Sequence, residues 1–226
     1  MTPAAYDEIA DIYDQHWGQD SVSFARSMID QVLAPLLPRH ARVIDLCCGT
    51  GLIAGYLSAA GYRVLGVDES VKMLNIARAR APKAEFQLAD MAQFRSPGQF
   101  DAAVSFYNSM NHARSHEHLR ETLRNVAKHL RRGGVMLFDY VAPQGFELAW
   151  EWSERSAAGR TLEYRYDPES RQAICIVDRR TAIVQNAFEA SLIHQALKDA
   201  GLAVLADDPV AAFIPSGARR VLLASK

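Results

Sequence analysis

One stretch of the chain, ARVIDLCCGTG at residues 41–51, constrains the fold more than any other. It begins as a short, β-branched, apolar run and passes directly into Gly49-Thr50-Gly51. This composition is typical of a buried parallel strand, because helices cover both faces of such a strand. The glycines that follow predict a tight turn, at which the backbone and the first N–H groups of a helix approach a ligand closely.

The same alternation of apolar strand and helix continues along the chain. Four further strands are predicted at YRVLGVD, AEFQLAD, FDAAVSFYN and VMLFDYV, within residues 62–141. Helices are expected between them, with ends marked by Gly61, Pro82 and Gly133-Gly134. Strands that alternate with helices form a mostly parallel sheet with helices on both faces. The sequence therefore predicts a Rossmann-like, doubly wound α/β fold.

Two additions to this sheet are expected within one domain that spans residues 1–226. At the start, residues 6–17 and 21–37 carry apolar side chains at helical spacing, which predicts an N-terminal helical cap over residues 1–38. A chain of 226 residues suits a single domain with insertions better than two separate domains.

The second addition follows the fifth strand, at residues 143–187. RTLEYRY and QAICIVDRR flank DPES, a turn signal, and together they predict an antiparallel hairpin at 160–182. We expect this hairpin to lie as a lid over the bound acceptor. A helix at 188–200 and two closing strands, LAVLADD and ARRVLLAS, complete the expected elements.

Charge and composition exclude several classes of partner. The 25 basic and 26 acidic side chains nearly cancel, so no net field attracts nucleic acid or an anionic membrane. No apolar run approaches the roughly 20 residues of a membrane-spanning helix, and residues 1–10 lack the apolar core of a signal peptide. Three cysteines without CxxC spacing fit a reducing compartment. We expect a cytoplasmic monomer or homodimer.

Polar residues and glycines gather where the expected parallel strands end. Ligands of open parallel sheets bind beyond these carboxyl ends. Asp68 ends the second strand, 19 residues after Gly49, where a carboxylate accepts hydrogen bonds from both hydroxyls of a ribose. A glycine turn alone is only a turn, but a turn followed by an acid at the next strand end favours nucleoside binding.

A dehydrogenase is an alternative, because Gly49, Gly51 and Ala54 also satisfy the dinucleotide fingerprint G-x-G-x-x-A. Asp45 argues against this alternative, since an anion just before the glycines repels a pyrophosphate but suits a cationic ligand. Asp90, at the end of the third strand, is well placed to bind an adenine amine. The chain also ends in a strand pair rather than in a separate substrate domain.

Taken in order, these motifs resemble those of class I S-adenosylmethionine-dependent methyltransferases over nearly the whole chain. The motifs are VIDLCCGTG at 43–51, then VLGVDES, LADM, FDAAVSFYNSMNH and LRRGGVMLFDY. The resemblance implies a seven-stranded sheet whose last strand is antiparallel, and S-adenosylmethionine as the cofactor. The leading YDEIADIYD segment is similar to the N-terminal cap helix of small-molecule members.

The resemblance also implies roles for individual residues. Asp45 and the glycine turn would hold the methionine part of the cofactor, and Asp68 its ribose. Asp90 and the backbone of Met91 would bind the adenine, while Tyr13 would close over the cofactor from the cap. The full expected cofactor set is Tyr13, Asp45, Cys47, Gly49, Thr50, Gly51, Asp68, Glu69, Ser70, Met73, Asp90, Met91, Phe106 and Asn108.

Cys47 departs from the family pattern, which commonly has glycine at this position. We expect the cysteine to be tolerated provided that its backbone avoids positive φ. Cys47 and Cys48 are expected to pack as small buried groups and not to form a catalytic thiolate.

The segment after the fourth strand indicates the acceptor class. Base-modifying members often carry Asn-Pro-Pro-aromatic there, whereas this chain has YNSMNH at 107–112, without proline. FYNSMNH is more similar to the small-molecule N-methyltransferases, including amino-sugar and glycine-type enzymes. Trp150, Trp152, Tyr164 and Tyr166 either line an apolar or cation-binding pocket or simply pack in the fold.

Methyl transfer is an in-line displacement at a sulfonium, so the enzyme mainly aligns donor and acceptor, which is worth roughly 7–11 kcal/mol. An amine acceptor must arrive unprotonated, and a histidine with a pKa near 7 suits that task. His112 and Tyr13 form the expected catalytic set, although a loop histidine with a structural hydrogen bond is the alternative for His112.

No metal site is expected, because His118 lies off the helix face shared by His112 and His116.

Two other functions stay open at this point. The first is a small-molecule O- or C-methyltransferase of the same fold, which differs in the atom that gains the methyl group. The second is a non-catalytic accessory protein that binds S-adenosylmethionine without turning it over. None of these motifs predicts the identity of the acceptor.

Overall fold

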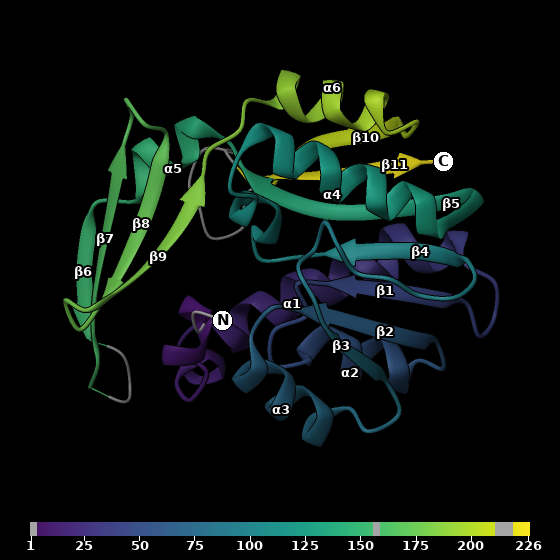
Figure 1. Cartoon of the computed structure of the whole chain (residues 1–226), viewed down its shortest axis with the longest axis horizontal. Helices are drawn as coiled ribbons and strands as arrows, with labels where there is room; N and C mark the ends of the chain where they lie inside the picture. Colours follow the sequence, from purple (N-terminus) through teal and green to yellow (C-terminus); the bar gives the residue numbers. More distant parts are fainter. Residues whose placement is uncertain (1–3, 156–158, 211–218) are drawn as a thin grey trace.

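The computed structural model describes residues 4–155, 159–210 and 219–226. A seven-stranded sheet with the order β10-β11-β5-β4-β1-β2-β3 forms its centre (Figure 1). β11 is antiparallel to both of its neighbours, and the ladders between the other strands are parallel. The predicted doubly wound sheet with an antiparallel last strand is therefore confirmed. Its strands are β1 (Arg42–Leu46), β2 (Arg63–Asp68), β3 (Glu85–Leu88), β4 (Phe100–Ser105), β5 (Leu130–Val141), β10 (Ala203–Val210) and β11 (Arg219–Ser225).

Helices cover both faces of this sheet because each carries one apolar stripe. On one face, α1 (Gln19–Met28) and α2 (Leu52–Ala59) pack against the strands, and α3 (Val71–Arg80) lies beside α2. On the other face lie α4 (His116–His129) and α6 (Ala190–Asp199), which contact each other. Side chains at the ends of these helices satisfy free N–H groups, as where the Ser115 hydroxyl accepts a hydrogen bond from His118 N–H.

The N-terminal cap is less regular than the predicted pair of helices. A 3₁₀ turn at Ala5–Glu8 and a π-helical turn at Asp14–Gly18 precede α1, and a π-helical turn at Ile29–Leu33 and a 3₁₀ turn at Ala34–Leu36 follow it. Ile9 and Ile12 are nevertheless buried, as their spacing predicts. Contacts with a distant part of the chain override the local helical preference here.

That distant part is the insertion after β5, which is larger than the predicted hairpin. It comprises α5 (Pro143–Ala149) and a four-stranded antiparallel sheet, with β7 (Thr161–Asp167) and β8 (Gln172–Val177) as the expected hairpin. β6 (Trp152–Arg155) and β9 (Thr181–Asn186) flank this hairpin as additional strands.

The inserted sheet and the cap form one layer beyond the carboxyl ends of the central strands (Figure 1). The buried face of the inserted sheet packs against the apolar side chains of the cap, including Ile9 and Ile12. The cap and the inserted sheet share this apolar cluster, so each buries apolar side chains of the other. This layer covers the edge where ligands of parallel sheets bind.

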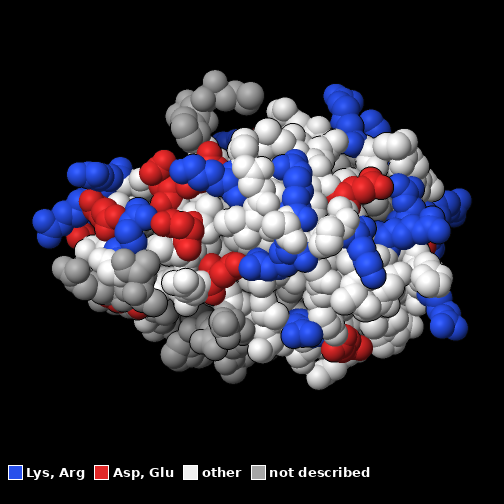
Figure 2. All heavy atoms as spheres, turned by 90° about the horizontal axis from the view of Figure 1, so that it is seen from below, with Lys and Arg blue, Asp and Glu red and all other residues white. Residues whose placement is uncertain are grey.

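Charged side chains of both signs share the face shown in Figure 2. Acidic side chains gather at the end that carries the inserted sheet, where they are mixed with basic side chains. This mixing accords with a formal net charge of −1 for the whole chain. Within the described residues, none of the helices has the length and apolar character that a bilayer crossing requires.

Candidate active site

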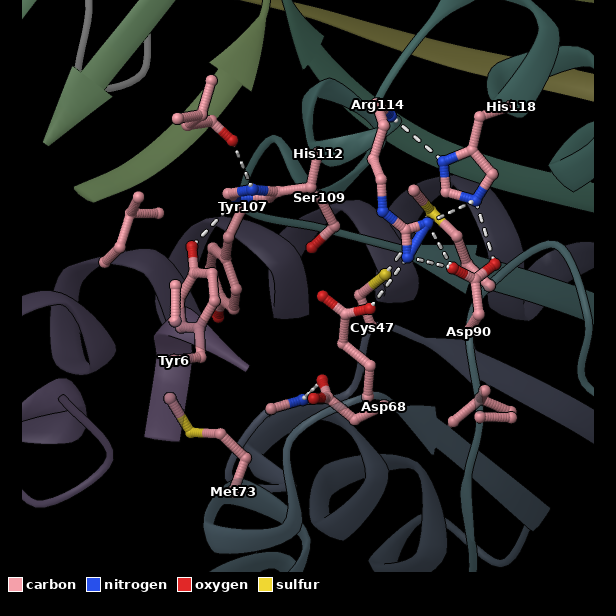
Figure 3. A pocket seen from close by; sticks show the side chains of 18 of the residues that line it. Tyr6, Cys47, Asp68, Met73, Asp90, Tyr107, Ser109, His112, Arg114 and His118 are labelled. Carbon is pink, nitrogen blue, oxygen red and sulfur yellow. Dashed lines mark hydrogen bonds and ion pairs between the residues drawn. The ribbon is translucent and has the colours of Figure 1, made fainter. Parts of the chain in front are cut away.

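A cavity of about 200 Å³ lies beyond the carboxyl ends of β1, β2, β3 and β4 (Figure 3). The structure thus brings together residues that are far apart in the sequence, as the strand-end argument predicts. The predicted site residues that line this cavity are Tyr13, Cys47, Gly49, Asp68, Glu69, Met73, Asp90, Met91 and His112. The predicted residues that do not line it are Asp45, Thr50, Gly51, Ser70, Phe106 and Asn108.

The turn between β1 and α2 owes its shape to two glycines. Gly49 and Gly51 have φ values of 51° and 79°, a region that other residues rarely enter. A side chain at Gly51 would place its Cβ 2.9 Å from the Cα and Cβ of Ala77 on α3. Gly51 therefore allows α2 and α3 to pack closely, whereas Gly49 faces the cavity. Thr50 joins the turn to the cap by donating a hydrogen bond to Asp14 Oδ1 (2.5 Å).

Cys47 adopts the conformation that we expected it to avoid. Its φ is 58°, so the expectation that the backbone would leave the left-handed region is wrong. A non-glycine residue in this region is strained by roughly 1–3 kcal/mol, which the surrounding structure must offset. Cys48 is buried as expected, but Cys47 is partly exposed and lines the cavity. Burial, together with the charge of Asp68, raises the pKa of the Cys47 thiol, so it stays protonated.

Asp68 is held in a fixed orientation by the backbone. Gly49 N–H donates to its Oδ2 and Ser70 N–H to its Oδ1, both at 2.9 Å. Burial raises the pKa of this carboxyl to about 6, against the opposing effect of these two hydrogen bonds. The carboxyl faces the cavity (Figure 3), so hydroxyl donors of a ligand can reach lone pairs that the backbone leaves available.

Asp45 lies beneath the glycine turn rather than in the main cavity. Its side chain is buried, and Oδ2 has no hydrogen-bond partner among the described residues. Burial, and to a smaller extent the charge of Asp68, raises the pKa of Asp45 to about 8, against the opposing effect of a hydrogen bond from the backbone of Ala54. A buried carboxyl oxygen without a partner among the described residues calls for an explanation, and a cationic ligand group beside it would favour the ionised form of Asp45. Asp45 lines a small adjoining hollow below Gly49 and Thr50.

Asp90 is already occupied by protein groups. Its Oδ1 accepts from Ala92 N–H (2.7 Å) and His118 Nε2 (2.9 Å), and its Oδ2 accepts from both terminal nitrogens of Arg114 (2.6 and 2.5 Å). Despite an opposing effect of burial, these hydrogen bonds and the nearby positive charge lower the pKa of Asp90. Figure 3 shows the Arg114 side chain reaching across the cavity to this carboxylate.

Arg114 and His118 are functional candidates that the sequence did not reveal. Arg114 N–H donates to His118 Nδ1 (3.0 Å), so the ring proton resides on Nε2, where it bonds Asp90. Arg114 also pairs with Glu69 across 3.3 Å, which links the ends of β2 and β3. The only sequence signal for His118 was its spacing from other histidines, and that signal pointed to a metal.

His112 lies on the opposite side of the cavity from Asp90 (Figure 3). Its Nδ1 donates to the backbone oxygen of Val184 (3.2 Å), which leaves Nε2 to accept the hydroxyl proton of Tyr6 (2.9 Å). Burial lowers the pKa of His112 to about 4, so the expected pKa near 7 is not found. The ring is neutral at physiological pH, but Tyr6 occupies its one basic nitrogen. Sequence reasoning missed Tyr6, although it begins the YDEIADIYD segment.

The three neighbouring histidines have different environments. His112 contacts Tyr6, His118 binds Asp90, and the ring of His116 packs against Phe188 with centroids 5.4 Å apart. In the part of the chain that the structure describes, no three His, Cys, Asp or Glu side chains are grouped as metal ligands.

The remaining predicted cofactor residues do not line the first cavity. Ser70 accepts a hydrogen bond from Met73 N–H (3.1 Å) and caps α3, and Phe106 is buried in the core. Asn108 binds Gln185 through its amide nitrogen (2.6 Å), and its backbone N–H donates to Asp139 (2.8 Å).

A second cavity, of about 660 Å³, adjoins the first on the side of the inserted sheet. Trp150 and Tyr164 line it, whereas Tyr166 stacks on Phe146 with ring centroids 5.8 Å apart. The aromatic residues of the insertion therefore divide between a cavity wall and packing. The side chain of Trp152 lies outside the described residues.

Comparison with known proteins fits this geometry. Residues 43–134, from β1 into the start of β5, match the family described as a methyltransferase domain. The dTDP-3-amino-3,6-dideoxy-alpha-D-glucopyranose N,N-dimethyltransferase of Streptomyces fradiae is 31% identical over 171 residues, which cover 73% of this chain and 66% of that enzyme. This chain belongs to the class I S-adenosylmethionine-dependent methyltransferases.

Further methyltransferases extend the comparison. The dTDP-3-amino-3,4,6-trideoxy-alpha-D-glucopyranose N,N-dimethyltransferase of Streptomyces venezuelae is 30% identical, over 62% of this chain and 61% of that enzyme. The matched stretches thus span just under two thirds of these two relatives. The S-adenosylmethionine-bound amino pentose methyltransferase CalS10 of Micromonospora echinaspora has the same fold, with a TM-score of 0.72 at 19% identity, over 100% of this chain and 98% of that one.

Proposed function

We propose that this methyltransferase transfers a methyl group from S-adenosylmethionine to the nitrogen of a small-molecule amine. The observation that carries the proposal is the meeting of two cavities at the ends of β1 and β4. Tyr6, Tyr13, Tyr107 and Ile183 line both cavities and form the boundary between them. A donor in the first cavity and an acceptor in the second would meet at this boundary, where alignment is the main contribution to catalysis.

The residues of the first cavity fit S-adenosylmethionine, which supplies a methyl group activated by its sulfonium. We assign the ribose hydroxyls to Asp68, whose carboxyl is oriented toward the cavity by Gly49 and Ser70. The buried, unpartnered oxygen of Asp45 fits the ammonium group of the methionine part, because a cation would stabilise its charged form. Met91 and Met73 supply apolar contacts in the same cavity, and Tyr13 closes it from the cap.

The adenine amine requires a change at Asp90. Both carboxylate oxygens are engaged, and Arg114 provides two of the contacts. Arg114 is 60% exposed, so it can move into solvent at little cost and leave Oδ2 to the adenine amine. His118 and Ala92 would keep the carboxylate in place meanwhile.

A path for the proton of the amine runs from the boundary through Tyr6 to His112. Tyr6 lines both cavities at this boundary, and its hydroxyl already donates a hydrogen bond to His112 Nε2. We propose that one proton of the acceptor's ammonium group passes to the Tyr6 oxygen as the Tyr6 proton passes to Nε2, so that the positive charge moves from the acceptor to the His112 ring. The amine then holds a lone pair for attack on the methyl group, and Tyr6 remains neutral. Tyr13 and Tyr107 flank the same position from the cap and from the end of β4.

The names of the two relatives support an amine acceptor, since both proteins are named as N,N-dimethyltransferases of an amino sugar. We carry over only the amine, because the chain matches less than two thirds of either enzyme. The three cysteines of the chain are free thiols, which fits the reducing cytoplasm in which we propose that the protein works.

Calorimetric titration tests the cofactor part of the proposal. We expect S-adenosylmethionine and S-adenosylhomocysteine to bind, and Asp68→Ala to weaken both by roughly 10- to 100-fold, as the loss of hydrogen bonds to a charged group predicts. Asp30→Asn is the matched control, because this exposed acid accepts a hydrogen bond from Tyr56, and neither residue lines either cavity. Binding of NAD instead, or of neither adenosyl compound, would overturn the assignment.

Methyl transfer to a panel of amines, alcohols and activated carbons then separates the open alternatives. Transfer to amines alone supports the proposal, and transfer to oxygen or carbon supports the other methyltransferase classes. A protein that binds S-adenosylmethionine and produces no S-adenosylhomocysteine with any acceptor would be an accessory protein.

A further inference from the structure

The second cavity carries a chemical pattern that defines its ligand more narrowly than an amine. It lies between the cap and the inserted sheet, and its walls include Trp17 from the cap and Trp150 and Tyr164 from the insertion. The Trp150 and Tyr164 rings meet edge to face, with centroids 5.4 Å apart. Such aromatic walls attract a positively charged group as well as apolar carbon.

A carboxylate lies within these aromatic walls. Glu154 Oε1 accepts a hydrogen bond from His16 Nε2 (2.8 Å) and another from the Tyr164 hydroxyl (3.3 Å). His16, Glu154 and Tyr164 all line the cavity, and Glu151 adds a second acid. An ammonium group that enters the cavity therefore finds an anion and aromatic faces together, which is the combination that recognises organic cations.

Two hydrogen-bond donors in the same cavity lack a partner in the part of the chain that the structure describes. The hydroxyl of Tyr107 and the indole nitrogen of Trp150 are buried, and neither meets an acceptor among the described residues. Buried donors without partners are uncommon and costly, at about 1–3 kcal/mol each. Ligand oxygens in this cavity would satisfy them, and hydroxyl or ether oxygens are the neutral groups that do so.

The cavity offers little to a phosphate. Arg219 is the one arginine among its described lining residues, which include no lysine, and Arg219 is paired with Asp139 and bonded to Asn108. A nucleoside diphosphate needs guanidinium, ammonium or helix N-terminal donors to offset its charge. Glu151 and Glu154 would repel it instead.

We infer that the second cavity binds the methyl acceptor as a compact organic ammonium that carries neutral oxygens and no phosphoryl group. This inference rests on the proposed function and narrows its substrate class. Glu154 favours a positively charged acceptor, and Trp150 and Tyr107 donate hydrogen bonds to its oxygens. The tyrosines that line both cavities then direct its nitrogen toward the first cavity.

A matched panel of amines tests the phosphate part of the inference. Radiolabelled S-adenosylmethionine is offered with ethanolamine and phosphoethanolamine, with glucosamine and its phosphate ester, and with a dTDP-linked amino sugar. We expect the phosphate-free member of at least one pair to be methylated with a kcat/KM roughly tenfold or more above its ester. Equal or better use of the esters or of the dTDP sugar would overturn the inference, while the methyltransferase function would stand. Methylation of none of these amines would also overturn it.

Variants of the cavity test the roles of individual side chains. We expect Glu154→Gln to raise the KM for the best phosphate-free amine roughly tenfold, with the S-adenosylmethionine Kd unchanged. Glu163→Gln is the matched control, since Glu163 lies on the neighbouring strand, next to Tyr164 and outside the cavity lining, where it pairs with Arg165 and Arg179. Equal effects of the two variants would remove Glu154 from acceptor binding.

Trp150→Phe keeps the aromatic wall and removes one unpartnered donor. We expect it to reduce the preference for glucosamine over cyclohexylamine, which has a similar ring and no hydroxyls. An unchanged ratio would show that Trp150 does not bind acceptor oxygens. If the wild-type protein does not bind S-adenosylmethionine at all, the proposed function itself fails.

Discussion

The two halves of the site hold their residues in different ways. At the ends of the central strands, backbone groups orient the side chains of the site, as where Gly49 and Ser70 N–H donate to the two oxygens of Asp68. In the cap and the inserted sheet, side chains hold one another, as in the contact of His16 with Glu154. Backbone contacts survive most substitutions elsewhere, whereas side-chain pairs are lost or replaced one at a time. A constant cofactor suits the first arrangement, and an acceptor that differs between relatives suits the second.

This difference predicts two classes of variant. Changes at the strand ends should alter stability and cofactor affinity together, because the same backbone serves both. Changes in the cap or the inserted sheet should alter acceptor kinetics and leave cofactor affinity unchanged. The four predictions below test this division.

The largest effect is expected at Gly51. Gly51→Ala places a Cβ against Ala77 and keeps the backbone at positive φ, so we expect a loss of roughly 3 kcal/mol or more in the free energy of unfolding. Gly201→Ala separates the two causes, since Gly201 has a similar φ and nothing within 4 Å of its added Cβ. It should lose only about 1–2 kcal/mol in urea unfolding. Equal losses would mean that α2 and α3 are not closely packed at Gly51.

The second prediction concerns Asp45 and its unusual pKa of about 8. An unfolded chain releases this proton near pH 4, and the folded protein retains it until about pH 8. Because the folded state binds more protons in this window, stability falls as pH rises from about 4 to 8. Asp45→Asn removes the ionisable group. We therefore expect it to raise the Tm at pH 8 by at least about 2–4 °C, which corresponds to about 1 kcal/mol in a chain of this size.

The same variant should lose cofactor affinity, by roughly 100-fold in calorimetry. In the wild type, the affinity should rise between pH 6 and 8, because a cationic ligand favours the ionised forms of Asp45 and Asp68. A destabilised Asp45→Asn protein at pH 8, or affinity that is independent of pH, would mean that Asp45 is a structural acid with an unseen partner.

The sequence predicted the central sheet and its strand-end residues well, and the reason is local. Each strand is a short apolar run, and each ends at a polar residue or glycine, so the edge that carries Asp68 and Asp90 follows from the topology alone. The glycine turn was equally clear. The conformation of Cys47 was not predicted, since its φ of 58° is one that a cysteine rarely adopts.

The contacts of the cap and the inserted sheet, where we propose that the acceptor binds, were predicted poorly because the residues that make them are distant in the sequence. Tyr6 meets His112 across 106 positions, and His16 meets Glu154 across 138. No spacing rule reaches that far. The aromatic residues of the insertion alternate as in any strand, so only the fold decides that Tyr164 lines the cavity and that Tyr166 packs on Phe146. Burial likewise lowers the pKa of His112, an effect that a sequence cannot reveal.

The third prediction tests the boundary between the two halves. Tyr6→Phe and His112→Ala should each lower kcat by roughly 10- to 100-fold, because each interrupts the same proton path. The double variant should be no slower than either single one, since residues that act as a unit are not additive. The Kd of S-adenosylmethionine should stay near the wild-type value. Additive losses would contradict the shared path, and an unchanged pH profile in His112→Ala would exclude a base role.

The fourth and smallest effect is expected at Arg114, which lies on the cofactor side yet is held by side chains alone. Its pairing with Asp90 and Glu69 competes with the adenine amine, so Arg114→Ala should tighten S-adenosylmethionine binding by about fivefold or less, the scale of an exposed ion pair. Arg120→Ala on α4, which pairs with Glu117 and Asp199, is the control and should change nothing. Weaker binding in Arg114→Ala would mean that the guanidinium contacts the bound cofactor. In that case the cofactor half, too, would depend on a side-chain contact, and the division between the two halves would not hold at this residue.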